Sequence, residues 1–145
     1  LSLPIEAFKA YLQEEHHHPK HVNISFELIK GRNTIQIVKD DPLTFQSNID
    51  MDMSIVELIG PMPLDNPKVI QLIEKEIEKQ FTARYDKLIE TLQELNVDPI
   101  GFGKKYRIHQ KKQTLTKSEW RDIFPNVDVT FNIDVSILDY GELSN

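Results

Sequence analysis

The chain has 145 residues, of which 39% are hydrophobic and 28% charged, and its formal net charge is −6. This composition is typical of a folded domain with its own core, and it excludes an intrinsically disordered chain. No apolar run approaches the ~20 residues that span a bilayer. The absence of cysteine excludes disulfides, thiolate metal sites and cysteine nucleophiles. We expect one domain over residues 1–145, and the start at Leu1 predicts further segments upstream.

The first part of the chain has the pattern of a short helix followed by a polar loop. Apolar residues share one face over residues 3–14, and His16, His17 and His18 follow. A histidine run invites a metal-site interpretation. However, consecutive side chains diverge and Pro19 ends the helix, so a helix-to-strand loop is favoured.

Strands are predicted next, because apolar and polar residues alternate. The alternation covers residues 22–29 and 34–38, and the Gly-Arg-Asn stretch at 31–33 reads as a hairpin turn between them. Residues 40–42 form a second turn, and residues 45–59 alternate again with Phe, Ile and Met on one face.

A long amphipathic helix is predicted from Pro67 to Leu95. Its apolar positions recur about every 3.6 residues, which is the α-helical period. Asp65 or Asn66 can cap its start, and Asn96 suits a left-handed stop. The apolar positions are Ile70, Ile73, Ile77, Phe81, Tyr85, Leu88, Leu92 and Leu95, and the outer face carries Glu74, Lys75, Glu78 and Lys79.

Two shorter helices and a strand complete the chain. Asp98 before a proline predicts a helix over about 99–110. Thr116 and Glu119 match a capping box, which starts a short helix that ends at Pro125. Residues 127–137 alternate strictly between apolar and polar side chains.

These elements predict an α+β fold in two layers. We expect a mostly antiparallel sheet of about four strands, with one long and two or three short helices packed on one face. Whether the last strand pairs parallel or antiparallel with residues 45–59 is left open, because the intervening helices are long enough for a crossover.

Charge is distributed unevenly along the chain. Residues 104–121 carry +6, whereas the remainder carries −12. A basic segment on an acidic body suggests a surface for an anionic partner or a membrane face, although a solvated loop gives the same pattern. The cations of this candidate interaction surface are Lys104, Lys105, Arg107, Lys111 and Lys112.

Catalytic and metal-binding patterns are weak. Asp50 and Asp52, with Asp128 and Asp134, could form an acidic sheet face for acid–base chemistry or Ca²⁺. Alternation with Asn, Thr and Ser is more typical of a solvated face, and that face lacks aromatic residues for nucleic-acid stacking. We therefore expect no catalytic residue, no metal, no cofactor and no nucleic-acid partner.

The glycines near residue 102 have a structural interpretation. Gly101 and Gly103 resemble part of a dinucleotide loop, but Tyr106 stands where the third glycine belongs and a helix precedes the motif. We interpret the glycines as allowing close helix packing, with Phe102 as a core anchor.

A set of motifs in the second half resembles a known family. The order is a long helix, Asp-Pro-Ile-Gly-Phe-Gly at 98–103, a basic run, Trp-Arg-Asp-Ile-Phe-Pro at 120–125, and an alternating strand. This order resembles the C-terminal domain of the Ger(x)C family, the C subunits of nutrient germinant receptors of endospore-forming bacteria. The motif residues are Asp98, Pro99, Gly101, Phe102, Gly103, Trp120, Phe124 and Pro125.

The resemblance implies a location and partners that the residues do not show. Family members are lipoproteins on the outer face of the inner spore membrane, they act with two membrane-embedded subunits, and they are not known as enzymes. The chain would then be the C-terminal domain of a larger lipoprotein subunit, working through protein–protein contacts and through contacts with the membrane surface. Two other hypotheses stay open: a domain that binds a nutrient in an apolar pocket, and a hydrolase that uses the aspartates.

Overall fold

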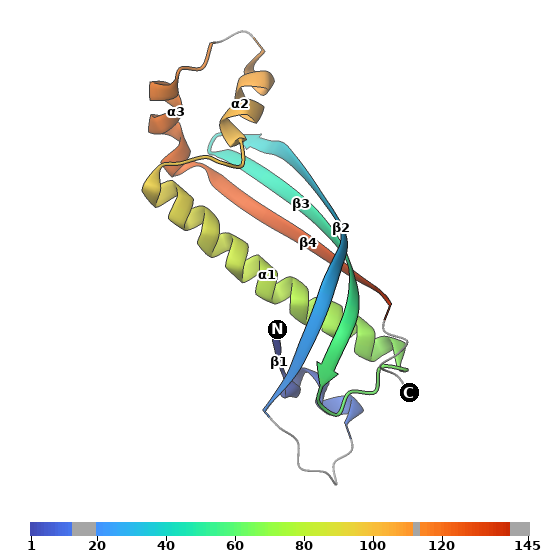
Figure 1. The fold of residues 1–145 in the computed structure, drawn as a ribbon. Helices are drawn as coiled ribbons and strands as arrows, with labels where there is room; N and C mark the ends of the chain where they lie inside the picture. Colours follow the sequence, from blue (N-terminus) through green and yellow to red (C-terminus); the bar gives the residue numbers. More distant parts are fainter. Residues whose placement is uncertain (13–19, 112–113, 140–145) are drawn as a thin grey trace. The chain divides into compact units, whose positions relative to one another are not determined.

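The computed structural model describes residues 1–12, 20–111 and 114–139 (Figure 1). No helix in these ranges is long and apolar enough to cross a membrane. The elements, in chain order, are β1 (Ser2–Pro4), the 3-10 helix η1 (Ile5–Tyr11), β2 (His21–Asp40), β3 (Leu43–Ile59), α1 (Pro67–Leu95), α2 (Phe102–Gln110), α3 (Lys117–Ile123), the 3-10 helix η2 (Phe124–Asn126) and β4 (Asp128–Asp139).

The four strands form one mixed sheet in the order β1-β2-β3-β4. β1 is antiparallel to β2, and β2 turns back into β3. Asn132 donates to Asn48 and Ser54 donates to the carbonyl of Asp139, so positions in β3 and β4 increase together and the two strands are parallel. The expected α+β class is confirmed. Of the two pairings left open for the last strand, the structure has the parallel one, which requires a crossover through the helices.

The predicted hairpin at residues 31–33 is wrong. β2 runs unbroken from His21 to Asp40, and the turn lies at the Asp41–Pro42 peptide, which is cis. The inward positions are even-numbered near the start of β2, where Val22 and Ile24 are buried, and odd-numbered further on, where Ile35 and Ile37 are half-buried, so the alternation changes phase within the strand. A β-bulge produces such a change without ending the strand, and glycine is common at bulges, so the glycine of the supposed turn suits a strand interior.

The first predicted helix needs correction as well. Residues 2–4 form β1, whose backbone pairs with residues 21–23, and only Ile5–Tyr11 is helical, as a 3-10 helix. Leu3 is buried, as predicted, but it lies in strand β1 and not on a helix. The histidines at 16–18, and with them the loop interpretation, lie outside the described residues.

The chain divides into two compact units. Unit 1 comprises residues 1–32, 50–81 and 133–145, and unit 2 comprises residues 33–49 and 82–132. In unit 1, the first half of α1 buries the predicted Ile70, Ile73 and Ile77. The unit's other buried apolar side chains are Leu3, Phe8, Val22, Ile24, Met51, Met53, Ile55, Leu64, Val69 and Val135.

In unit 2, α1 follows the predicted stripe only in part, because Tyr85 and Leu92 are half-buried while the other two predicted positions are exposed. Leu88 and Leu95 are 44% and 66% exposed, whereas Ile89 is buried. Gln93, one turn further on the same face, donates to the carbonyls of Phe124 and Val127. Tyr85 of the predicted stripe packs on Phe131 of β4, with the ring centroids 5.3 Å apart. Ile89 and Leu88 differ by about 100° around the helix, so the buried face overlaps the predicted stripe at Tyr85 and is shifted from Leu88 toward Ile89.

Candidate functional site: the capped basic helix α2

A single carboxylate, that of Asp98, organises the start of α2. Its Oδ1 accepts the backbone N–H groups of Gly101 at 2.9 Å and Phe102 at 3.0 Å. Its Oδ2 accepts the N–H of Gly103 at 2.8 Å and the indole Nε1–H of Trp120 at 3.1 Å. The first N–H groups of a helix have no acceptor inside the helix, and this carboxylate provides the missing acceptors. The predicted helix start at residue 99 is wrong, because α2 begins at Phe102 with Gly101 as its N-cap, and the Asp98 side chain reaches forward to these N–H groups from three residues before the N-cap.

Two motif glycines have separate roles. Gly101 has φ of 95°, a left-handed conformation that side chains disfavour, and open space surrounds the position of a Cβ. A Cβ on Gly103 would lie 2.8 Å from Nε1 of Trp120, so only glycine lets the indole approach this helix. Gly103 therefore lies where α2 and Trp120 pack closely, and Gly101 lies in the turn before α2.

Aromatic side chains complete a cluster around Asp98, which we call the Asp98 node. It consists of Asp98, Gly101, Phe102, Gly103, Trp120 and Phe124. The ring of Phe102 is fully buried and lies 5.0 Å from Phe45 of β3 and 6.4 Å from Phe124, centroid to centroid. Trp120 lies 5.6 Å from Phe124 and stacks on Tyr106 at 5.8 Å. These contacts join α2, α3 and β3, so this part of the motif holds unit 2 together. Pro99, in the connection before α2, and Pro125, inside η2, are both exposed.

The N-cap half of the predicted capping box at α3 is present, whereas the Glu119 carboxylate binds the Thr116 hydroxyl and not the Thr116 backbone N–H. Thr116 Oγ1 accepts the N–H of Glu119 at 3.1 Å and donates to the Glu119 carboxylate at 3.0 Å. Capping fixes where α3 begins and therefore which of its residues face α2.

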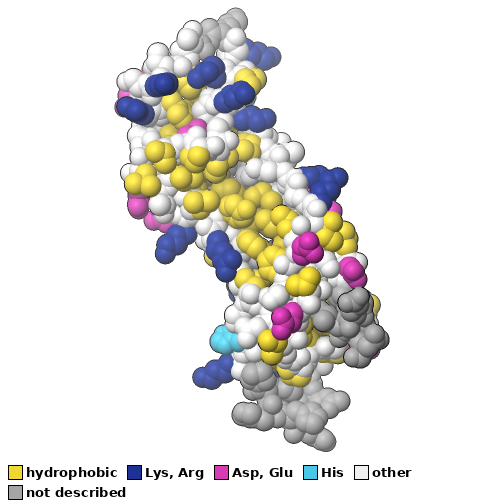
Figure 2. Space-filling view, in the orientation of Figure 1, with side chains coloured by type: hydrophobic (Ala, Val, Ile, Leu, Met, Phe, Trp, Pro, Cys, Tyr) yellow, Lys and Arg dark blue, Asp and Glu magenta, His cyan; other side chains and the backbone are white. Residues whose placement is uncertain are grey.

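The outward side of α2 is cationic. Lys104, Lys105, Arg107 and Lys111 are all exposed, and Figure 2 shows Lys and Arg side chains gathered over α2 and α3. His109 Nε2 lies 2.8 Å from Asp40 Oδ1 at the end of β2. Lys112, the fifth predicted cation, lies outside the described residues.

The aspartates of the sheet do not form a metal or catalytic cluster in the described ranges. Arg32 lies 3.8 Å from both Asp50 and Asp52, so a cation already faces these carboxylates. No group of three or more potential metal ligands occurs among residues 1–12, 20–111 and 114–139. Asp128 and Asp134 are exposed on β4, as expected of a solvated face.

Sequence reasoning missed two glutamates that contact the sheet. Glu74 and Glu78, predicted on the outer face of the long helix, are half-buried in unit 1. Glu78 Oε2 accepts the N–H of Val135 and Glu74 Oε2 accepts the N–H of Ile137, each at 2.8 Å. β4 is the edge strand, so these carboxylates satisfy amides that no further strand pairs. The i, i+4 spacing of the two acids was the one available signal.

Burial raises the pKa of the Glu74 carboxyl above 4.5. The hydrogen bond from Ile137 opposes this change, and the nearby charges of Glu78 and Asp134 add to it. The raised pKa means that the fold disfavours the charged form of this carboxyl.

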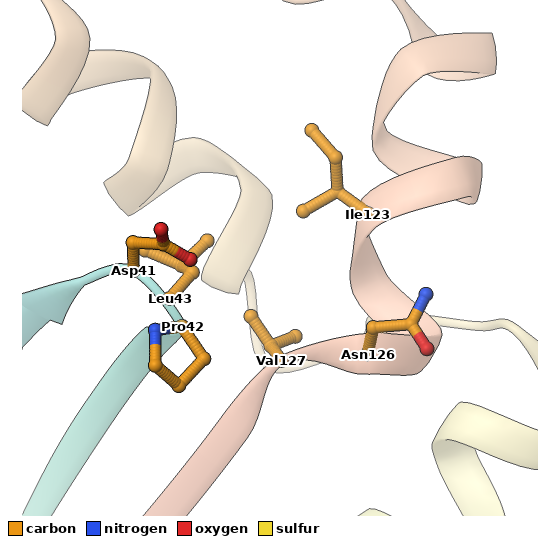
Figure 3. Close-up of a pocket in the computed structure, with 6 residues that line it drawn as sticks. All are labelled: Asp41, Pro42, Leu43, Ile123, Asn126 and Val127. Carbon is orange, nitrogen blue, oxygen red and sulfur yellow. The ribbon is translucent and has the colours of Figure 1, made fainter.

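A shallow pocket of about 260 Å³ lies in unit 2 (Figure 3). Ligand pockets usually measure about 300–1,000 Å³, so this one is small. Its lining is mainly apolar, and the Asn126 amide points away from Asp41, so the two polar groups do not converge. The lining residues are Asp41, Pro42, Leu43, Ile123, Asn126 and Val127.

A mixed sheet, a helix that crosses between its parallel strands and a capped aromatic node define an α+β domain. The chain matches the family described as spore germination B3/GerAC like, C-terminal, over residues 6–141, and it belongs to that family. This membership confirms the resemblance read from the motifs and associates the chain with spore germination.

The similar proteins are longer than this chain. It is 23% identical over 138 residues to the spore germination protein YndF of Bacillus subtilis, covering 92% of this chain and 34% of that protein. It is 27% identical over 118 residues to the spore germination protein GerQC of Bacillus cereus, covering 81% and 32%. The crystal structure of the GerBC protein has the same fold, with a TM-score of 0.67 at 19% identity, over 85% of this chain and 41% of that one. The chain thus spans about a third of its curated relatives.

Proposed function

We propose that this chain is the C-terminal domain of a lipid-anchored germinant-receptor subunit and that it acts through surface contacts without catalysis. The receptor would lie on the outer face of the inner spore membrane, with two membrane-embedded subunits as partners. The observation that carries the proposal is the cationic outward side of α2, which the Asp98 node orients. Family membership supports the role in germination.

The cationic side suits a docking role because no described carboxylate neutralises it. No ion pair within 4.0 Å joins Lys104, Lys105, Arg107 or Lys111 to an acid of the described ranges. The rest of the molecule is acidic, so this patch gives the domain a defined orientation toward negative charge.

A germination assay tests the proposal. Spores that carry Lys104→Glu, Lys105→Glu, Arg107→Glu and Lys111→Glu together should contain the protein at normal levels and fail to germinate on nutrients. The matched control is Lys30→Glu, Lys68→Glu, Lys75→Glu and Lys87→Glu, which changes the net charge equally at dispersed exposed positions. Normal germination of the α2 variant at normal protein level would refute the proposal.

Nutrient binding is the second candidate, and the pocket beside Pro42 is the observation that favours it. Its apolar lining suits a small nutrient, and Ile123→Trp should fill it. Calorimetric titration of the chain with nutrient germinants should give saturable heat that Ile123→Trp abolishes. If no nutrient gives such heat, this candidate is excluded.

A further inference from the structure

The outward side of α2 has a pattern beyond its charge. Phe102 and Gly103 are buried and Tyr106 stacks on Trp120, so these residues mark the inward side. At about 100° per residue, the opposite side has an apolar residue between cations. That residue, Ile108, is 64% exposed. The residues of this outward side are Lys104, Lys105, Arg107 and Ile108, and the exposed Lys111 follows them at the C-cap, where its φ is 59°.

Contacts at both ends of α2 hold this side outward. The Asp98 carboxylate binds three N–H groups at its start, and the close approach of Gly103 to the indole of Trp120 fixes its rotation. At the other end, His109 contacts Asp40. The helix therefore cannot turn to bury Ile108 without breaking the node that the motif residues build.

We propose that this outward side binds the anionic phosphates of lipid headgroups, with Ile108 inserted among them. The inference rests on the proposed function, because it names the chemistry that the cationic side of α2 recognises. A cationic face around an exposed apolar side chain is the pattern of helices that lie at membrane interfaces. Lysines near an anionic membrane attract it through their charge, and their stems bury against apolar surface.

Two observations favour a lipid surface over an acidic protein. The cations stand on the outer side of a helix, and the pocket of unit 2 is lined by none of them. The same unit also exposes apolar side chains just before α2: Leu95 at the end of α1, and Val97 and Ile100 in the connection that follows.

Sedimentation with vesicles tests the inference on the intact chain. The probes are vesicles of phosphatidylcholine with about 30 mol% phosphatidylglycerol, and vesicles of phosphatidylcholine alone. The chain carries −6 overall, so general electrostatics opposes its binding to anionic lipid. We expect binding to the mixed vesicles only, weakened at least tenfold by raising NaCl from about 50 to about 500 mM, since salt screens the contact.

Variants assign the binding to this side of α2. The four α2 charge reversals should abolish sedimentation, and the four dispersed control reversals should reduce it far less. Ile108→Ser should weaken binding several-fold while leaving thermal unfolding unchanged, because the side chain is already exposed.

Each outcome decides the inference. Absence of binding to the mixed vesicles, or equal loss with both sets of reversals, would overturn it. If the chain ignores vesicles while the α2 reversals still block germination, the lipid inference fails and the proposed function stands with an acidic protein as the partner. If vesicles bind and germination is normal, the surface chemistry is right and the proposed function is wrong.

Discussion

Asp98 in unit 2 and Glu74 in unit 1 perform the same chemistry, because each carboxylate accepts backbone N–H groups that lack a partner in regular secondary structure. Asp98 serves donors three to five residues ahead in its own loop and helix. Glu74 serves a donor 63 residues away, at the edge of β4. The first arrangement depends only on residues close together in the sequence, whereas the second forms only after β4 has joined the sheet.

The difference also appears in the energetics of the two carboxyls. Asp98 gathers four donors, including the Trp120 indole, around one group. Glu74 has one backbone donor against burial and two acidic neighbours, and its pKa is raised. The edge-strand contact therefore holds the Glu74 carboxylate in a place that penalises its charge.

The largest expected effect separates buried from exposed positions of the predicted stripe on α1. Ile77 is fully buried in unit 1, so Ile77→Asp leaves an unpaired charge in the core and should cost more than about 4 kcal/mol of unfolding free energy. Leu95→Asp is the matched control, because that side chain is already in water. Circular dichroism should show an unfolded Ile77 variant and a native Leu95 variant. A cooperative melt of the Ile77 variant near the wild-type temperature would contradict this packing.

The next effect tests the Asp98 node. Asp98→Ala removes the acceptor of four donors and should cost about 2–3 kcal/mol. Asp98→Asn should cost less, because its amide oxygen still accepts two N–H groups while its NH₂ faces the donors of Gly103 and Trp120. Urea unfolding followed by the fluorescence of Trp120, the sole tryptophan, reports unit 2 directly. Identical midpoints for the wild type and Asp98→Ala would show that the node contributes nothing.

A smaller effect, with a pH signature, tests Glu74. Glu74→Ala orphans the N–H of Ile137 and should cost about 1 kcal/mol, whereas Glu74→Gln keeps an acceptor and removes a penalised charge. Because the folded-state pKa is raised above 4.5, the stability gained on protonation is present below pH 4.5 and is lost as pH rises through the folded pKa.

The stability of Glu74→Gln relative to the wild type should therefore increase as pH rises through that window. Urea midpoints of the two proteins, measured at intervals from pH 4 to pH 8, give this difference. The contributions of the other carboxyls cancel, because both proteins contain them. A difference that does not change with pH would contradict the raised pKa.

The smallest effect concerns a purely local cap. Thr116→Ala removes the hydroxyl that accepts the Glu119 N–H and should cost about 1 kcal/mol or less. Thr116→Ser keeps the hydroxyl and serves as the control. Trp120 fluorescence again gives the unfolding midpoint, and a loss as large as that of Asp98→Ala would mean that the two caps are not as different as their contacts indicate.

Some of the wrong predictions share one cause. The supposed turn at Gly31 and the exposed Leu88 both follow local rules of turn composition and helical spacing. In each case contacts with other segments override the local pattern: β2 pairs with β3 along the sheet, and in the second half of α1 Ile89 is buried while Gln93 binds the carbonyls of Phe124 and Val127. The spacing of apolar residues identifies a possible apolar face of a helix, but it does not specify which element packs against that helix or on which side.

The sequence by itself determined the long helix, the Thr116 cap of α3, the alternating strands β3 and β4, and the motif that places the chain in its germination family. These features depend on hydrogen bonds and periodicities within a few residues, which composition and order encode directly. Only the tertiary structure decided the parallel pairing of β4, the rotation of the buried side of α1, the use of Glu74 and Glu78 at the sheet edge, and the outward cationic side of α2. Each of these depends on contacts between residues far apart in the chain, whose partners no local pattern specifies.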